Sequence, residues 1–276
     1  MADVDAYAAG IDALRDTAAQ MFDDAAARLD FSTPRAAELS LQYLQGLYES
    51  LYIAMGDAAD VLINEWLETV AAENGISLDE LEADISGNQQ ARDYAERQFQ
   101  KSLEIAQGGN VAEALAAMKS DLDARLSWRV RHDTVKHGRR GGYSGRKHLP
   151  KVYEFAWVPF GDTCAYCLAI ASRGWVSTAE EINAFETHIH GGCDCKLIAR
   201  VIDSGEFPEI GKQADEYARM YEAAKGNGNS NDAINALRRE QYRDEETRER
   251  LRAQHREAYR RRQEAAEIKK AWNGEQ

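Results

Sequence analysis

The four cysteines of this chain form two close pairs within one short stretch of its 276 residues. Cys164 and Cys167 have two residues between them, and Cys193 and Cys195 have one. Thiolates this close in sequence can supply the soft ligands of a tetrahedral structural zinc site. The spacing therefore predicts that one Zn²⁺ ion cross-links the middle of the chain.

The fourth ligand of this site stays open. Cys193 and Cys195 are so close that one of them can fail to face the ion, and His190 is then the natural replacement. His188 is a weaker candidate, more typical of a surface or packing histidine. Four thiolates leave no coordination position for a reactive water, so we expect a structural ion and no enzyme activity. The candidate ligands are Cys164, Cys167, His190, Cys193 and Cys195.

Redox and catalytic roles for the cysteines fit the sequence less well. A redox-active dithiol at Cys164 and Cys167 would need a surrounding βαβ pattern, which the sequence lacks. A zinc deaminase would need an upstream His-x-Glu, and a zinc protease would need His-Glu-x-x-His; the sequence contains neither motif. Buried, chemically inert cysteines remain as the simplest alternative.

The composition is that of a globular protein, with 29% charged and 9% aromatic residues. The acidic amino terminus lacks the features of a secretory signal, and no apolar run approaches the roughly 20 residues that a membrane-spanning helix needs. We therefore expect a protein without a membrane partner in a reducing compartment, where paired cysteines more often bind metal than form disulfides.

The net charge of −13 conceals a basic strip over residues 126–150, in which seven Lys and Arg stand against one Asp. Such a charge run is often a solvated face, which here would balance the acidic N-terminal helices. The alternative is contact with DNA phosphates, with an affinity that falls steeply with salt. The candidate phosphate-contacting residues are Arg129, Arg131, Lys136, Arg139, Arg140, Arg146 and Lys147.

Periodic apolar residues predict a helical first half whose apolar stripe favours antiparallel packing and self-association. Thr33 and Pro34 start the longest helix, and Asn74 and Gly75 stop it. A flexible basic loop over 138–147 comes next. The expected helices of this half span about 4–29, 34–73, 78–85, 89–106 and 111–130.

Two short strands, over 152–158 and 195–201, are expected to flank one or two helical turns over 164–172. A helix over 214–224, a Gly/Asn linker and a polar helix over 232–272 complete the chain.

The expected fold class is therefore mainly α with a small α+β module. We expect an antiparallel helical N-terminal domain over 1–137 and a cysteine-rich, zinc-stapled α+β module over 138–210. A helical C-terminal region over 211–276 ends in the long polar helix. The module is too small to rely on its own apolar core, so a metal staple makes physical sense there.

Two stretches around the cysteines resemble a known protein family. Residues 163–174 read Thr-Cys-Ala-Tyr-Cys-Leu-Ala-Ile-Ala-Ser-Arg-Gly, and residues 190–198 read His-Gly-Gly-Cys-Asp-Cys-Lys-Leu-Ile. Together they resemble the signature of minor head proteins of tailed bacteriophages, the Mu F-like head-morphogenesis group of actinobacteriophage type. Residues 217–224 and 234–239 resemble the C-terminal pattern of that group. The resemblance covers roughly residues 125–240.

This resemblance implies a few-copy, non-enzymatic structural protein of the virion, in the capsid interior or at the portal vertex, that is made in the host cytoplasm. Its implied partners are the portal and the capsid or scaffold proteins, with packaged genomic DNA as a further candidate. Two alternatives from other classes remain. One is a zinc-containing nuclease that uses His132, His137 or His188, and the other is a cytoplasmic DNA-binding regulator.

Overall fold

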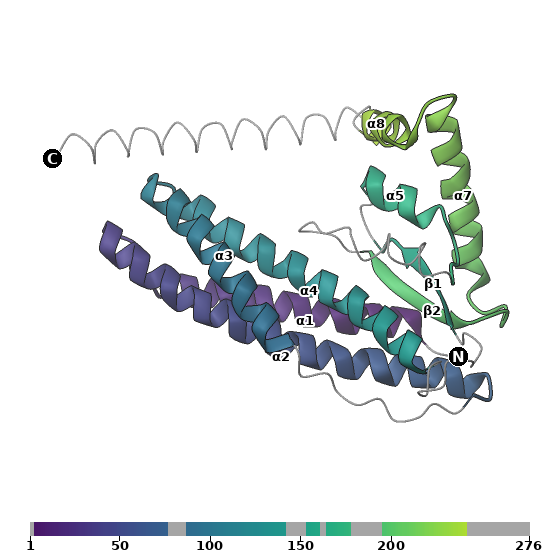
Figure 1. Ribbon diagram of the computed structural model, residues 1–276, viewed down its shortest axis with the longest axis horizontal. Helices are drawn as coiled ribbons and strands as arrows, with labels where there is room; N and C mark the ends of the chain where they lie inside the picture. Colours follow the sequence, from purple (N-terminus) through teal and green to yellow (C-terminus); the bar gives the residue numbers. More distant parts are fainter. Residues whose placement is uncertain (1–2, 77–86, 142–152, 161–163, 178–194, 242–276) are drawn as a thin grey trace. The chain divides into compact units, whose positions relative to one another are not determined.

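The computed structural model describes residues 3–76, 87–141, 153–160, 164–177 and 195–241. Within these ranges the chain forms seven helices and one two-stranded antiparallel sheet (Figure 1). The mainly helical fold with a small strand-containing part is therefore confirmed. The zinc staple stays a prediction, because His190 and Cys193 lie outside the described residues.

The first two helices begin and end at the local signals that the sequence contains. Helix α1 spans Val4–Ala26, and the Asp3 carboxylate accepts the Ala6 N–H at 3.0 Å at its start. Helix α2 spans Pro34–Glu73, and the Thr33 hydroxyl accepts the Ala36 N–H at 3.2 Å. Proline at the first helical position and a capping threonine thus start α2 as expected.

Helix α2 ends where the sequence predicts. Gly75 adopts a φ of 72°, and the Ile76 N–H donates to the Ala71 carbonyl at 2.9 Å. This is the hydrogen bond of a Schellman C-cap, in which glycine takes the left-handed conformation without a Cβ penalty. The short helix expected over 78–85 lies outside the described residues.

Helices α3, Gly87–Gln107, and α4, Val111–Gly141, are joined by a tight break. The Asn110 side chain accepts the Glu113 N–H at 3.0 Å and donates to the Glu113 carboxylate at 2.6 Å. This reciprocal pair satisfies a backbone donor of the first turn of α4.

Helix α4 continues past Val130 and through the first residues of the expected basic loop, as far as Gly141. The prediction of a loop from Gly138 onward is therefore wrong for residues 138–141. A Cβ at Gly138 would lie 2.6 Å from Cζ of Phe155, so this glycine lets the helix approach the following strand closely. Tertiary packing thus outweighs the cost of about 1 kcal/mol that glycine brings to a helix.

The sheet pairs β1, Tyr153–Val158, with β2, Lys196–Val201, in antiparallel register from Tyr153↔Val201 to Val158↔Lys196. Both strands occur where expected. Helix α5, Ala165–Ala171, contacts β1 and occupies the place of the expected helical turns. Nearly every residue of β1 is buried, so both faces of this strand are covered.

Two further helices complete the described chain. Helix α7, Pro208–Lys225, begins earlier than expected because Pro208 starts it, and helix α8, Ser230–Gln241, follows the Gly/Asn linker. Both contact α5. The remainder of the expected C-terminal polar helix, residues 242–276, lies outside the described residues. None of the described helices is long and apolar enough to cross a membrane.

The chain divides into two compact units, and each is discontinuous in sequence. Of the described residues, unit 1 contains 3–15, 55–76, 124–141, 153–160, 164–177 and 195–241, and unit 2 contains 16–54 and 87–123. Helices α1, α2 and α4 therefore contribute residues to both units. The three-part division of the chain by sequence stays a prediction.

Each unit has its own buried residues. In unit 1, the strands and α5 share a core with residues of α1, α2, α4 and α7, including Trp66, Phe155 and Ile198. In unit 2, Tyr48 donates to the Asp121 carboxylate at 2.6 Å, and the rings of Tyr52 and Tyr94 meet edge to face at 5.7 Å. Both cores are thus rich in aromatic side chains.

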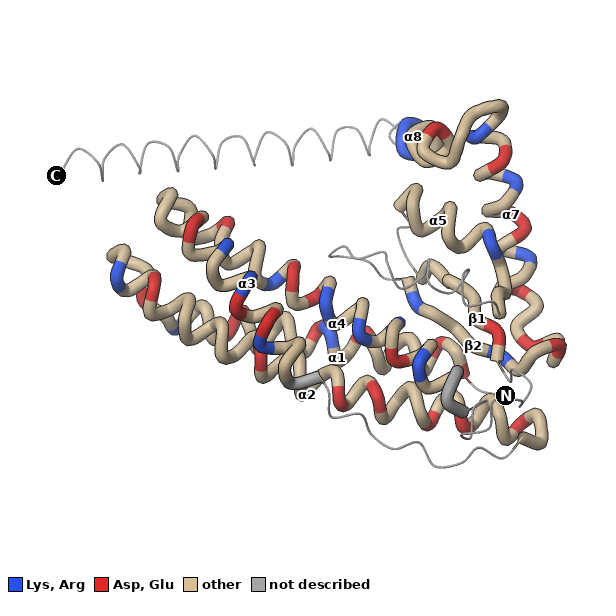
Figure 2. The backbone as a smooth tube through the Cα atoms, viewed as in Figure 1, with Lys and Arg blue, Asp and Glu red and all other residues tan. Residues whose placement is uncertain are grey.

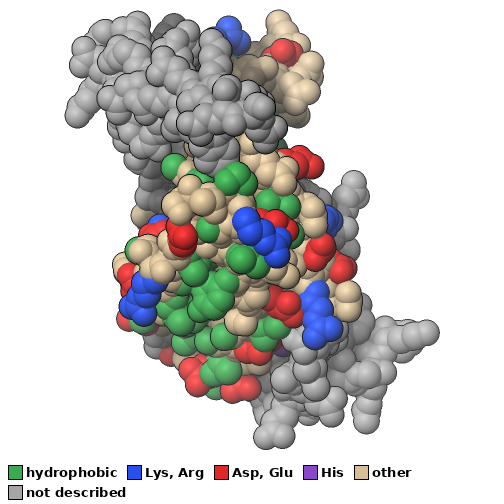
Figure 3. Space-filling model, turned by 90° about the vertical axis from the view of Figure 1, so that its left-hand side faces the viewer, with side chains coloured by type: hydrophobic (Ala, Val, Ile, Leu, Met, Phe, Trp, Pro, Cys, Tyr) green, Lys and Arg blue, Asp and Glu red, His purple; other side chains and the backbone are tan. Residues whose placement is uncertain are grey.

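The surface is mixed in character. Figure 2 marks the positions of acidic residues along the long helices with basic ones among them. Figure 3 shows a face on which hydrophobic side chains lie exposed between charged ones. In unit 2, Met21, Leu39 and Tyr43 are large hydrophobic residues that are 45%, 50% and 59% exposed. The expected self-association of the N-terminal helices stays a prediction, with these residues as its candidates.

We predict that Gly138→Ala destabilises the protein by about 1–3 kcal/mol, because the new methyl group must displace the buried Phe155 ring. The matched control is Gly211→Ala in α7, where no atom lies within 4 Å of an added Cβ. At that position alanine should raise the free energy of unfolding by as much as about 1 kcal/mol, because it favours the helix more than glycine does. Urea unfolding measures both changes, and equal effects of the two substitutions would contradict the close packing of α4 on β1.

Candidate functional site

Three of the four cysteines lie in the described part of the chain. Cys164 caps the N-terminus of α5, and its sulfur accepts the Cys167 N–H at 3.4 Å. Cys167, in the first turn of α5, and Cys195, directly before β2, are both buried. All three belong to or pack against the core of unit 1. The three cysteines therefore share one extensive core, although Cys195 is distant in sequence from the first pair.

The metal-ligand set itself stays a prediction. Within the ranges that the structure describes, no three His, Cys, Asp or Glu side chains gather closely enough to hold a metal ion. His188, His190 and Cys193 lie outside these ranges. The donor chemistry of the first pair fits a zinc knuckle, because an N–H that donates to sulfur favours the thiolate, the form that binds zinc.

The start of the basic strip is buried. Arg129 and Arg131 are only 6% and 2% exposed. The Arg129 guanidinium lies 2.7 Å from the Asp57 carboxylate and 3.3 Å from that of Asp133. The Arg131 guanidinium stacks over the Trp157 ring, 4.9 Å from its centroid.

These contacts differ from the expected phosphate contact for Arg129 and Arg131, because both side chains serve the interior of unit 1. The burial of both arginines also differs from the alternative of a solvated face, although the partners of Arg129 are acidic residues of α2 and α4. Lys136 is half-buried. Arg139 and Arg140 belong to α4, but their side chains are not described, and Arg146 and Lys147 lie outside the described residues.

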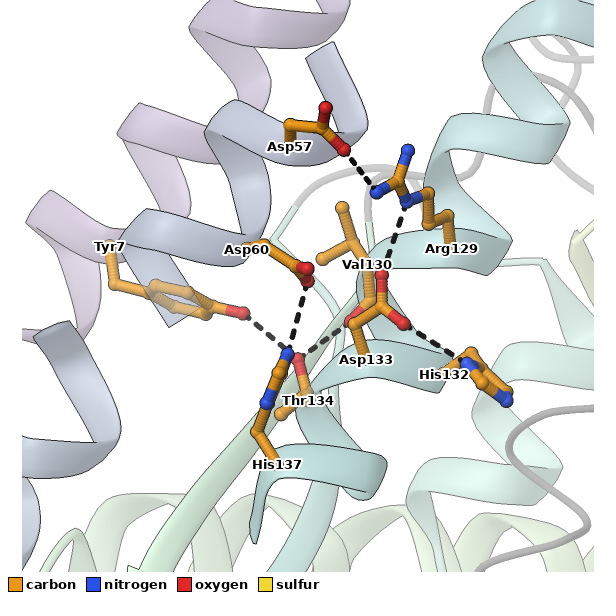
Figure 4. Close-up of polar contacts among 9 residues, drawn as sticks. All are labelled: Tyr7, Asp57, Asp60, Arg129, Val130, His132, Asp133, Thr134 and His137. Atoms are coloured by element: carbon orange, nitrogen blue, oxygen red, sulfur yellow. Dashed lines mark hydrogen bonds and ion pairs between the residues drawn. The ribbon is translucent and has the colours of Figure 1, made fainter. Parts of the chain in front are cut away.

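A network of polar side chains joins α1, α2 and α4 within unit 1 (Figure 4). His137 is 1% exposed, and its Nε2 lies 3.2 Å from the Asp60 carboxylate. His132 Nδ1 lies 3.1 Å from the Asp133 carboxylate. In Figure 4 the Asp60 carboxylate and the His137 ring point toward each other from facing helices.

A second branch of the network involves α1. The Thr134 hydroxyl donates to the Val130 carbonyl at 2.7 Å, and it lies 3.3 Å from the Tyr7 hydroxyl. Burial raises the pKa of Tyr7 to about 12, although the hydrogen bond with Thr134 acts in the opposite direction. The phenol therefore stays neutral at physiological pH and serves as a hydrogen-bonding group.

Gly56 makes room for the ion pairs of this network. A Cβ at this position would lie 1.9 Å from Nη1 of Arg129. Since Arg129 is held by carboxylates on both sides, its guanidinium has little freedom to move away. The glycine on α2 thus creates the space that the arginine on α4 fills.

The charge of Asp60 is favoured by its surroundings. Burial raises the pKa of this carboxyl, but the hydrogen bond and the charge of His137 act against burial. A hydrogen bond with Asp133 and the charge of Arg129 act in the same direction as His137. The net result is a pKa below the ordinary value of 3.8, so the folded state favours the ionised form.

Sequence analysis did not single out Asp57, Asp60 or Tyr7. One signal was available, since Asp57 and Asp60 are spaced one turn apart among apolar residues of α2. The sequence could not predict which base pairs with each acid, because the partners are far apart in the chain; Asp57 and Arg129, for example, are 72 residues apart.

His137 is poorly placed for acid–base chemistry on a substrate, whereas the side chain of His132, paired with Asp133, is 38% exposed. Histidine–aspartate pairs orient imidazoles in many enzymes, but such a histidine must also reach the substrate. His137 is almost fully enclosed, and the carboxylates beside it form no metal-holding group in the described ranges. The geometry instead suits the joining of α2 and α4 across a buried surface.

We predict that Asp60→Asn destabilises the protein by about 1–3 kcal/mol at pH 7, since it leaves buried His137 without its carboxylate. The pKa of Asp60 is lowered on folding, so its charge contributes stability above about pH 3.8. That stability is lost as the pH falls below this value. The difference in the free energy of unfolding between wild type and Asp60→Asn should therefore become smaller at acidic pH.

Urea unfolding between pH 7 and pH 3 measures this difference, with Asp16→Asn, at an exposed position of α1, as the control. A difference for Asp60→Asn that is constant over this pH range would contradict the ionised, His137-bound carboxylate.

Comparison with known proteins gives one match. The model of the VG15 protein family matches residues 1–224, which include the N-terminal helices, both cysteine pairs and most of α7. No curated protein and no solved structure matches the chain.

Proposed function

The chain belongs to the VG15 protein family, which indicates a bacteriophage protein, and on that premise we propose that it is a non-enzymatic minor capsid protein that acts in head morphogenesis. The family match carries this proposal. It extends over most of the chain, so it includes the segments around the cysteines that resemble the Mu F-like minor head proteins.

A structural role is supported by how unit 1 uses its polar residues. The ionisable side chains of Asp57, Asp60, Arg129 and His137 bind one another between α2 and α4. Arg129, Asp60 and His137 are largely buried, although Asp57 is exposed. Ion pairs with a buried member are costly to disrupt and hold helices in one arrangement. A nuclease would need such groups open to its substrate; His137 is enclosed, so among the described histidines of that alternative only the partly exposed His132 could serve it.

The proposed partners are the portal and the capsid or scaffold proteins, and the proposed location is the capsid interior or the portal vertex. The packaged genome is a further candidate partner. Because Arg129 and Arg131 are buried, any contact with phosphates falls to the remaining basic residues of the strip, Lys136, Arg139, Arg140, Arg146 and Lys147.

We predict that purified phage particles contain a few copies of this protein, and that a nonsense mutation in its gene yields defective heads. Quantitative mass spectrometry of particles, with the major capsid protein as the internal reference, measures the copy number. Affinity purification from infected cells tests for the portal protein, with a tagged unrelated phage protein as the control. Absence of the protein from both heads and assembly intermediates would sink the proposal.

We further propose that a structural Zn²⁺ ion is bound by Cys164, Cys167 and Cys193, with Cys195 or His190 as the fourth ligand. The described part supports this through the Cys167 N–H that donates to the Cys164 sulfur and through the common location of Cys164, Cys167 and Cys195 in unit 1. The ion would supply cross-linking only, since four protein ligands leave no position for water.

We predict about one zinc per chain in protein purified without chelators, and a loss of on the order of 10 kcal/mol of stability when zinc is removed. Cys164→Ser and Cys167→Ser should abolish stoichiometric zinc, whereas His188→Gln should retain it. Separate Cys195→Ser and His190→Gln variants identify the fourth ligand. Elemental analysis and thermal unfolding give the readouts, and a zinc-free wild type of unchanged stability would exclude the staple.

A further inference from the structure

Unit 1 contains a cavity of about 480 Å³ between the start of α1, the end of β1 and the start of α7. This volume lies within the range of about 300–1,000 Å³ that ligand sites occupy. Val158, Phe207 and Ile210 are buried, whereas Phe160 is 37% exposed. The cavity therefore has a floor of buried apolar side chains and an accessible aromatic side chain at its wall. Its apolar lining is Val4, Val158, Phe160, Phe207 and Ile210.

The charged residues that line this cavity all have the same sign. They are Asp3, Asp5 and Glu209, and each of them is exposed. The polar residue that completes the described lining, Gln213, carries no charge. Lys196 lies near the cavity, with its ammonium 5.7 Å from the centroid of the Phe160 ring, but it is paired with the Asp12 carboxylate at 2.7 Å. An anionic ligand such as a phosphate would therefore meet the three exposed carboxylates of the lining. The potential of the cavity is thus complementary to a cation.

A bare metal ion does not fit this cation site. Hard divalent cations need several oxygen ligands within about 2.0–2.6 Å. The carboxylates of Asp3, Asp5 and Glu209 do not gather into such a group, as is true of every described acidic cluster. Moreover, the Asp3 carboxylate caps α1 by accepting the Ala6 N–H. An extended ligand with separate cationic and apolar parts fits this spread of charges better.

The backbone at the floor of the cavity is held in an unusual conformation. Phe207 has a φ of 52°, which a bulky side chain rarely adopts. Its ring stacks on Trp175, with 6.4 Å between the centroids. Strained residues that tertiary packing enforces are found disproportionately at ligand sites. Phe207 thereby belongs to a preformed floor.

We propose that this cavity binds a short basic peptide segment of another protein chain. An apolar side chain of the segment enters between Phe160 and Ile210, and neighbouring Lys or Arg side chains meet Asp5 and Glu209. Charge complementarity at the rim selects the partner, and burial of the apolar side chain supplies most of the affinity. This inference concerns unit 1 alone and does not depend on the proposed role in head morphogenesis.

The test uses the full-length protein and three fluorescein-labelled peptides. The first, Gly-Arg-Leu-Phe-Arg-Gly, carries both features, the second replaces its arginines with glutamates, and the third replaces its apolar pair with glycines. Fluorescence anisotropy should show saturable binding of the first peptide. The Kd of each of the other two peptides should be higher by about tenfold or more. Binding of the first peptide should also weaken in 0.5 M salt, because exposed charge pairs are screened.

Variants of the protein locate the binding site. Asp5→Lys and Glu209→Lys each change an exposed residue, so they should preserve the fold and weaken binding of the first peptide by about five- to tenfold at low salt. Phe160→Ala should weaken it through lost apolar contact. The matched control is Asp215→Lys, which reverses the charge of an exposed residue that lies in α7, like Glu209, but outside the cavity. It should leave the Kd within about twofold of the wild-type value.

Four results would overturn the proposal. The first is no saturable binding of the arginine peptide, and the second is equal binding of its glutamate counterpart. The third is an equal loss of binding in Asp215→Lys and Glu209→Lys, which would indicate nonspecific attraction to an acidic surface. If sedimentation shows a dimer that Glu209→Lys dissociates, a second copy of this chain occupies the cavity and the assignment to another protein is wrong.

Discussion

The buried guanidinium of Arg129 is the interaction on which the arrangement of unit 1 depends. A charge removed from water is tolerated only where partners surround it, and here Asp57 and Asp133 lie on its two sides. The absence of a side chain at Gly56 provides the space. Because Asp57 belongs to α2 and Arg129 to α4, this pairing fixes one helix against the other, and the His137–Asp60 contact repeats the constraint two turns further along α4.

The position of α4 in turn determines how the strands pack. Gly138 lies against the Phe155 ring, so α4 reaches β1 at a distance that no larger residue permits. On the paired strand, Arg200 lies 2.7 Å from its register partner Glu154 and stacks over Trp175. The sheet is thus held between helices by close backbone approach and cross-strand charge pairing, in addition to its apolar core.

These constraints separate two uses of charge in the same protein. Inside unit 1, acids and bases occur in matched pairs, and their effect is to order the helices. At the cavity beside α1 and α7, the lining acids Asp3, Asp5 and Glu209 are exposed, with no described base lining the cavity beside them. Membership of the VG15 family indicates a phage protein.

The sequence by itself determined the mainly helical fold, both strands and most helix boundaries, because caps, glycine stops and apolar periodicity act within a few residues. The residues around the cysteines also indicated a bacteriophage protein, in agreement with the VG15 match, whereas the Mu F-like type that they resemble stays a prediction. The tertiary structure alone decided that Arg129 faces the interior, that α4 continues through Gly138 and that apolar and acidic residues of three elements meet in one cavity. Each of these depends on residues far apart in the chain, such as Asp57 and Arg129, and no local pattern encodes which distant side chain will fill a given space.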